Sequence, residues 1–220
     1  MPIIGLMTDR TTNSLLAEKG GTHAVEVAAV LVATIGALGS VRYAGLASWW
    51  TTPAILIVAG VVPYLIRGQS PAAVLRAQTF VRDVRLVICT CFVVFPLTFV
   101  ALRILQGLDL SLPSSRVRPS NYAAWVTYQF LYVAVAEEVF FRGYLLARWR
   151  VVFSGTWTAV AASAVGFALA HLVLQGQVSG LLTFLPGLVL GWLYIRTGTL
   201  LSPILFHGLA NVFWSLTVGY

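Results

Sequence analysis

The sequence has little charge, few acidic residues and almost no cysteine. Only 10% of its 220 residues are Asp, Glu, Lys or Arg, whereas 59% are hydrophobic. Soluble domains carry about 25% charged residues, so the composition excludes a soluble globular protein and predicts a membrane protein. The net charge of +7 does not indicate nucleic-acid binding, because the basic residues lie between apolar runs rather than on one amphipathic face. They are instead typical of membrane topology signals and lipid-headgroup contacts.

The only two cysteines, Cys89 and Cys91, lie inside one apolar run. At this spacing they project to different sides of a helix, which excludes a disulfide framework and a metal knuckle. We interpret them as small core or lipid-facing residues. No cleavable signal peptide is expected either, because residues 1–23 are mostly polar and the first apolar run is long enough to span a membrane.

Seven apolar runs predict transmembrane helices, with an error of about one helix. Because the runs are continuously apolar rather than alternating, a β-barrel is excluded. The predicted fold is an all-α, polytopic membrane bundle with about seven, and between six and eight, transmembrane helices. The runs cover residues 24–41, 46–66, 84–105, 121–149, 156–174, 181–195 and 200–220.

Three regions are predicted along the chain: a loose N-terminal tail at 1–23, N-terminal transmembrane helices at 24–120, and a second transmembrane domain at 121–220 that carries the polar residues described below. His23 and Glu26 lie where the first run begins and are expected to be interfacial and solvated. Segment 72–82 is compatible with a short helix lying on the headgroups. Pro96 predicts a kink in the third run, and a polar connector is expected at 106–120.

The basic residues predict the orientation of the bundle. With seven spans, nine of them fall on the N-terminal side of the membrane and four on the other, which favours a cytoplasmic N-terminus. The nine are Arg10, Lys19, Arg67, Arg76, Arg82, Arg85, Arg148, Arg150 and Arg196; the four are Arg42, Arg103, Arg116 and Arg118.

The fourth run contains two adjacent acids, Glu137 and Glu138, in otherwise apolar surroundings. Ionisable groups are costly inside a membrane and indicate a functional site by default. Arg142 follows Glu138 by four residues, so the two can form an ion pair on one helix face. Glu137 points about 100° away around the helix and needs other partners.

Two later runs each carry one histidine. His171 follows Phe167 by one turn, and His207 precedes Asn211 by one turn. Taken singly, a membrane histidine or asparagine usually forms a hydrogen bond between helices, and the pair of Glu138 with Arg142 can be purely structural. Exposure of any of these groups to lipid would cost several kcal/mol, so together they require a common interior. The constellation therefore predicts a chemical site.

Two chemistries are open for this site. In the first, Glu137 is a general base on water that His171 helps to hold, while His207 and Asn211 stabilise an oxyanion. In the second, Glu137, His171 and His207 hold a catalytic zinc ion with an open fourth position. The His-Glu-x-x-His signature of many zinc proteases is absent. Both chemistries describe water attack on an acyl carbon, which is amide hydrolysis inside a membrane.

Three motifs resemble those of the CAAX prenyl endopeptidase and bacteriocin-processing family of intramembrane proteases. They are Glu137-Glu138-x-x-x-Arg142, Phe167-x-x-x-His171 and His207-x-x-x-Asn211, in that order on successive predicted helices. The resemblance covers about residues 121–214. It includes Phe140-Phe141-Arg142-Gly143 after the acids and Pro203 before the last histidine.

The resemblance implies an intramembrane endopeptidase in which Glu137, His171, His207 and Asn211 are catalytic. Glu138, Arg142 and Phe167 would support them. No cofactor is favoured, although zinc is possible. The implied partners are the lipid bilayer and a membrane-anchored protein or peptide substrate that is prenylated, bacteriocin-like or a C-terminal sorting tail.

The implied location of the chain is a bacterial inner membrane. Two alternatives to an enzyme stay open: a non-enzymatic bacteriocin-immunity protein, and an ion-coupled transporter motivated by the intramembrane acids. No internal repeat supports the transporter.

Overall fold

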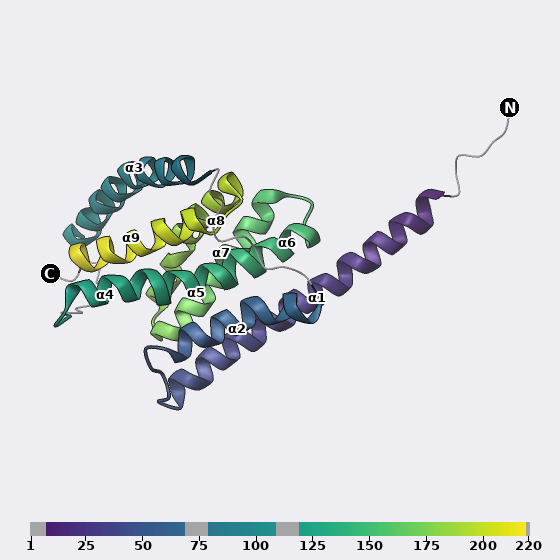
Figure 1. The fold of residues 1–220 in the computed structure, drawn as a ribbon, viewed down its shortest axis with the longest axis horizontal. Helices are drawn as coiled ribbons and strands as arrows, with labels where there is room; N and C mark the ends of the chain where they lie inside the picture. The colour runs from purple at the N-terminus through teal and green to yellow at the C-terminus, as the bar shows by residue number, and fades with distance from the viewer. Residues whose placement is uncertain (1–7, 69–78, 109–118, 219–220) are drawn as a thin grey trace.

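The computed structural model describes residues 8–68, 79–108 and 119–218, and within these ranges the chain is helical without a strand (Figure 1). The predicted all-α bundle is therefore confirmed. The described helices form seven continuous segments: α1 (Thr8–Tyr43), α2 (Thr51–Ile66), α3 (Phe80–Gly107), residues 122–152, α7 (Thr156–Gln175), residues 178–197 and α9 (Leu201–Val218).

Four stretches are long and apolar enough to cross a membrane by length and composition: Gly21–Tyr43, Phe80–Gly107, Thr156–Gln175 and Val178–Thr197. The helix Thr51–Ile66 is apolar but shorter. The apolar helices support an integral membrane protein, while the exact number of spans stays a prediction.

The acid-bearing segment 122–152 is not one uniform helix. It runs through α4 (Tyr122–Tyr128), the π-helix η2 (Gln129–Ala134), α5 (Val135–Glu138), the π-helix η3 (Val139–Leu146) and α6 (Ala147–Val152). Figure 1 shows it crossing the bundle between α9 and the α1–α2 pair, with α3 as a curved outer helix along α9. α2 packs on α5 and η3, α9 packs on η2 and α5, and α7 packs on η3. The segment is therefore the centre of the fold.

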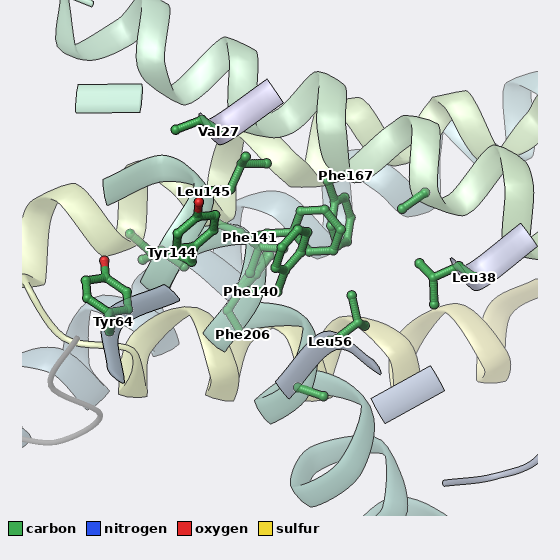
Figure 2. Close-up of a cluster of buried hydrophobic side chains, with 14 of the residues drawn as sticks. Val27, Leu38, Leu56, Tyr64, Phe140, Phe141, Tyr144, Leu145, Phe167 and Phe206 are labelled. Atoms are coloured by element: carbon green, nitrogen blue, oxygen red, sulfur yellow. The ribbon is translucent and has the colours of Figure 1, made fainter. Parts of the chain in front are cut away.

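Aromatic rings fill the core around this segment. Phe140, Phe141 and Phe167 gather in the middle of the main hydrophobic cluster (Figure 2), and all three are almost completely buried. The rings of Phe141 and Phe167 meet edge to face, with 5.0 Å between centroids. Such pairs add about 0.5–1.5 kcal/mol to the stabilisation from burial alone. The apolar face of the acid-bearing helix thus fixes that helix against α7.

Two glycines let neighbouring helices approach this segment closely. A Cβ atom at Gly60 of α2 would lie 3.1 Å from the backbone of Phe140, and one at Gly208 of α9 would lie 2.5 Å from the ring of Phe130. Small residues at such contacts allow helices to pack by close van der Waals contact, which drives association inside membranes. The acid-bearing helix is therefore held closely on two sides.

Several expectations change at the N-terminal end. The expectation of a loose tail is wrong from Thr8 onward, because α1 begins there and continues without a break to Tyr43. The reason is local: Leu15-Leu16-Ala17-Glu18-Lys19 are strong helix formers, and the segment has no proline. The second helix begins later than its apolar run, at Thr51, after the exposed Trp49 and Trp50.

Glu26, expected to be solvated, is only partly exposed. It is half-buried and forms an ion pair with Arg67, the residue that follows the end of α2. It also accepts a hydrogen bond of 3.3 Å from the Tyr144 hydroxyl. Three helical segments therefore meet at this carboxylate, a contact between distant residues that no local pattern indicates.

The third helix, α3, has Pro96 in its interior and is curved along its length in Figure 1, while a kink at Pro96 itself stays a prediction. Most of the expected headgroup helix at 72–82 and most of the connector at 106–120 lie outside the described residues. Cys89 is exposed and Cys91 half-buried, and both are free thiols.

Candidate active site

The two acids stand in a short α-helical turn between two π-helices. π-helical turns are rare and concentrate at functional sites. Two carbonyl groups of η3 accept hydrogen bonds from neighbouring helices: Gly143 from the Tyr64 hydroxyl at 2.8 Å and Phe141 from the Ser163 hydroxyl at 2.7 Å. These bonds tie η3 to α2 and α7, so the unusual helix geometry is fixed from both sides.

Glu138 is the centre of a buried polar network. Its Oε1 accepts a hydrogen bond of 2.9 Å from Arg142 and one of 2.7 Å from Nδ1 of His207. Arg142 also donates to the Gly187 carbonyl of α8 (Phe184–Thr197) at 3.1 Å, and both charged side chains are fully buried. The ion pair expected from the four-residue spacing is therefore present. The bond to His207 was not predicted, because the two residues are 69 positions apart.

The hydrogen bonds fix which nitrogen of each imidazole is free. Nδ1 of His171 lies 3.0 Å from the Phe167 carbonyl, and Nδ1 of His207 lies against the Glu138 carboxylate. Since both partners are acceptors, each Nδ1 carries a proton, and each Nε2 of a neutral ring presents a lone pair. The Nε2 atoms of His171 and His207 lie 3.7 Å and 3.6 Å from the same Glu137 oxygen, Oε2.

Phe167 forms the wall that holds the basic groups in place. Its ring centroid lies 4.3 Å from that of His171 and 5.8 Å from that of His207. The guanidinium of Arg142 sits over the same ring at 4.6 Å. A cation over an aromatic face is attracted by the ring quadrupole, and the attraction strengthens when water is excluded. A Phe one turn before His171 thus orders three groups of the site.

Glu137 has a buried oxygen with spare bonding capacity, as Glu138 also has. Glu137 is 6% exposed, and its Oε2 is buried without a hydrogen bond in the described part of the chain. The distances of 3.6 and 3.7 Å to the imidazoles exceed a direct hydrogen bond of about 2.7–3.2 Å. Arg142 offsets the charge of Glu138, which leaves Glu137 as an excess negative charge facing two imidazoles. This arrangement suits a proton-accepting carboxylate.

Asn211 lies one turn after His207 on α9, as predicted, but its amide nitrogen donates to Oε1 of Gln129 at 3.0 Å. Six of the seven predicted site residues therefore meet in one network. Asn211 lies outside this network and, through Gln129, joins α9 to the acid-bearing segment 122–152. Gln129 was not singled out from the sequence. The available signal was a lone amide in the apolar run, eight residues before Glu137.

Among the described residues, no group of three or more His, Cys, Asp or Glu side chains has the arrangement of a metal site. Glu137, His171 and His207 are nevertheless the side chains whose free donor atoms face one another.

The comparison with protein families identifies the C-terminal half. Residues 119–213 match the family described as Type II CAAX prenyl endopeptidase Rce1-like, a stretch that contains all three motifs from Glu137 to Asn211. No curated protein and no solved structure matched the chain. The match and the apolar helices together support an integral membrane protein, and residues 119–213 of the chain form a domain that matches the Rce1-like type II CAAX prenyl endopeptidase family.

Proposed function

We propose that Glu137 activates a water molecule for hydrolysis of a peptide bond within the membrane. The observation that carries this proposal is the buried Oε2 of Glu137, which has no hydrogen bond and faces Nε2 of His171 and of His207 at 3.7 and 3.6 Å. A water molecule between these atoms would donate one proton to the carboxylate and the other to an imidazole lone pair.

The proposed reaction proceeds by general acid–base catalysis. Glu137 takes a proton from the water, and the oxygen attacks the carbonyl carbon of the scissile peptide bond. The developing oxyanion accepts hydrogen bonds from the Asn211 amide and from Nε2 of His207, which for this step carries a second proton that Glu138 stabilises through Nδ1. Glu137 then passes its proton to the leaving nitrogen as the C–N bond breaks, which yields a carboxylic acid and an amine.

The proposed substrate is the C-terminal part of a membrane-attached peptide. The matched family is described by its action on CAAX prenyl sequences, in which a prenylated cysteine stands near the C-terminus. A prenyl chain would hold the peptide in the bilayer beside the site. The first probe is therefore a farnesylated CAAX peptide, and the same peptide without the lipid tests whether the prenyl chain is required.

The test is cleavage of this peptide, labelled with a fluorophore and a quencher on the two sides of the scissile bond, by the purified protein in liposomes. We expect the wild-type protein to cleave it and Glu137→Gln to be inactive. Glu26→Gln is the control, because Glu26 is a half-buried carboxylate that pairs with Arg67 in a different cluster. Cleavage by Glu137→Gln at the wild-type rate would exclude Glu137 as the base.

A zinc-dependent version of the same reaction is the second candidate. The donor types and ring orientations suit zinc, although the described side chains do not stand in the arrangement of a metal site: both imidazoles present Nε2 while a carbonyl or carboxylate holds Nδ1–H, as in metal-binding histidines. Glu137, His171 and His207 would hold the ion, which would polarise the attacking water. Elemental analysis of the purified protein and cleavage assays with a strong chelator decide between the two. Stoichiometric zinc whose removal abolishes cleavage would replace the metal-free mechanism.

A further inference from the structure

The hydrogen bond between Gln129 and Asn211 joins the acid-bearing helix to the helix that carries His207. Gln129 opens η2, two turns before Glu137, and Asn211 follows His207 by one turn. Both side chains are half-buried in a bundle whose interior is mostly apolar. A polar group in such surroundings is costly unless it is hydrogen-bonded, so the 3.0 Å contact between the two amides is worth more than a surface bond.

Close packing of η2 against α9 beside this hydrogen bond sets the distance between the two helices. Gly208, one residue after His207, lies against the ring of Phe130, where an added Cβ would come within 2.5 Å of a ring atom. η2 and α9 are therefore in direct contact at this level. Because packed interiors do not slide continuously, the position of residue 129 relative to residue 211 is set by the fold. Gln129 can act as a fixed reference for the Asn211 side chain.

An asparagine amide needs such a reference to serve as a hydrogen-bond donor. Its oxygen and nitrogen edges have nearly the same shape, so rotation by half a turn exchanges donor and acceptor at little steric cost. In the structure Oε1 of Gln129 accepts the hydrogen bond from the Asn211 amide nitrogen, so this contact places the nitrogen edge of Asn211 on the side of η2. One amide proton is used in this bond, and the second stays available in a defined direction.

We propose that Gln129 is a positioning residue that orients the Asn211 amide toward the carbonyl oxygen of the scissile bond. This inference rests on the proposed peptide hydrolysis. A donor fixed in advance stabilises the oxyanion without reorganisation during the reaction, so Gln129 acts on the transition state rather than on substrate binding.

The first experiment compares Gln129→Met with Gln129→Glu in the farnesylated CAAX peptide assay. Methionine keeps the length of the side chain but removes the acceptor, whereas glutamate keeps an acceptor oxygen. We expect Gln129→Met to lower kcat by roughly 10- to 100-fold with KM nearly unchanged, and Gln129→Glu to recover most of the loss. Gln106→Met is the matched control, because Gln106 bonds only to Arg103 on the exposed end of α3 in the described structure. A wild-type kcat in Gln129→Met would overturn the proposal.

A double-mutant cycle separates positioning from a general structural role. If Gln129 acts through Asn211, then Gln129→Met added to Asn211→Ala causes no further loss of kcat. Equal losses in the two backgrounds would overturn the proposal. Thermal unfolding of each variant in detergent micelles identifies any loss that comes from an unfolded fraction.

A measurement independent of catalysis keeps the two proposals distinguishable. Asn211 is one of three asparagines, so its side-chain amide can be followed by NMR in protein labelled with [¹⁵N]asparagine. We expect Gln129→Met to shift the Asn211 amide protons and reduce the difference between them, and Gln106→Met to leave them in place. Unchanged Asn211 signals in Gln129→Met would overturn the positioning role. Failure of the wild-type protein to cleave either peptide would count against the proposed function alone.

Discussion

Two buried carboxylates in this bundle, Asp83 and Glu137, differ in how completely they are hydrogen-bonded. Asp83 has no exposed surface, and both oxygens are used: Oδ1 accepts from Arg82, and Oδ2 accepts from the hydroxyls of Thr79 and Thr199. Glu137 is nearly as buried, but its Oε2 accepts no hydrogen bond. Native interiors rarely leave such an atom unpaired. Oε2 of Glu138 is unpaired as well, but Arg142 offsets the charge of Glu138, so Glu137 is the better candidate for a reactive group and the saturated Asp83 for a structural one.

The surroundings of the two acids also indicate a structural role for Asp83 and a reactive role for Glu137. Asp83 belongs to what we call the anchor cluster, formed by Thr79, Arg82, Asp83, Thr197 and Thr199. Arg82 also donates to the Thr197 carbonyl at 3.2 Å, so the cluster ties the start of α3 to the turn between α8 and α9. Around Glu137, two imidazoles approach without closing a hydrogen bond. One arrangement fixes a turn, and the other leaves room for chemistry.

The largest expected effect is the loss of catalysis in Glu137→Gln. Removal of a general base typically costs 10²- to 10⁴-fold, and we expect a loss of about 10³-fold in kcat, or about 4 kcal/mol in the barrier. The melting temperature in micelles should stay the same or rise, because the substitution removes an excess buried negative charge. Peptide cleavage and thermal unfolding measure the two effects. A strong fall in melting temperature with retained kcat would mean that Glu137 is structural.

The next effect concerns Glu138, which is both paired and close to the reaction. In Glu138→Gln the fully buried Arg142 loses its counter-charge, and breaking a buried pair in this way costs about 3–5 kcal/mol. We expect a large fall in stability. Adding Arg142→Met should recover much of it, because the buried cation is then gone. Cleavage should not return in the double variant, since His207 has still lost its carboxylate partner.

Unfolding of the three proteins in detergent, with cleavage measured on the folded fraction, tests this expectation. If Arg142→Met recovered cleavage as well as stability, Glu138 would act only through Arg142. A double variant no more stable than Glu138→Gln would show that the ion pair is not the source of the loss.

The sequence indicated one of these two clusters and not the other. Glu137 and Glu138 stand among apolar residues, where any acid is unexpected, so their burial and the pair with Arg142 could be predicted. Asp83 stands between Arg82 and Arg85 at the start of an apolar run, a setting typical of a solvated interface. Its partner Thr199 is 116 positions away, and no local pattern reports such a contact.

The same limit applies within the site. Counting along the runs places His171 late in its helix and His207 early in its own, which does not predict that both lie near Glu137. The structure brings them together because helix packing, including the close contact at Gly208, sets the relative depth of the helices. Residue types and three-residue gaps predicted which polar residues belong to the site. The depths and the Gln129 contact depend on tertiary packing, which the local pattern does not contain.

A substitution in the anchor cluster is expected to lower stability rather than catalysis, and its effect is smaller than those of the two substitutions above. Asp83→Asn keeps the size of the side chain but removes the charge and replaces one acceptor with a donor facing hydroxyl and guanidinium groups. We expect a loss of about 1–3 kcal/mol in stability and a kcat for the folded protein within a few-fold of wild type. Thermal unfolding and peptide cleavage measure these two quantities. The expected pattern, lower stability with retained kcat, is the reverse of that expected for Glu137→Gln. A loss of cleavage as large as in Glu137→Gln, at unchanged stability, would remove the distinction between the two acids.

The smallest effect is that of a single hydroxyl in the anchor cluster. Thr199 is fully buried and donates to Asp83 Oδ2 at 2.9 Å, so Thr199→Val leaves that oxygen with one donor fewer at nearly constant shape. We expect a loss of about 1 kcal/mol, seen as a fall of roughly 2–4 °C in melting temperature. Thr217→Val is the matched control, because the Thr217 hydroxyl bonds only to carbonyls of its own helix in the described structure, and its loss should be close to zero. If the two variants melted alike, the bond between α3 and the α8–α9 turn would contribute nothing. Full pairing of Asp83 would then no longer identify a structural carboxylate.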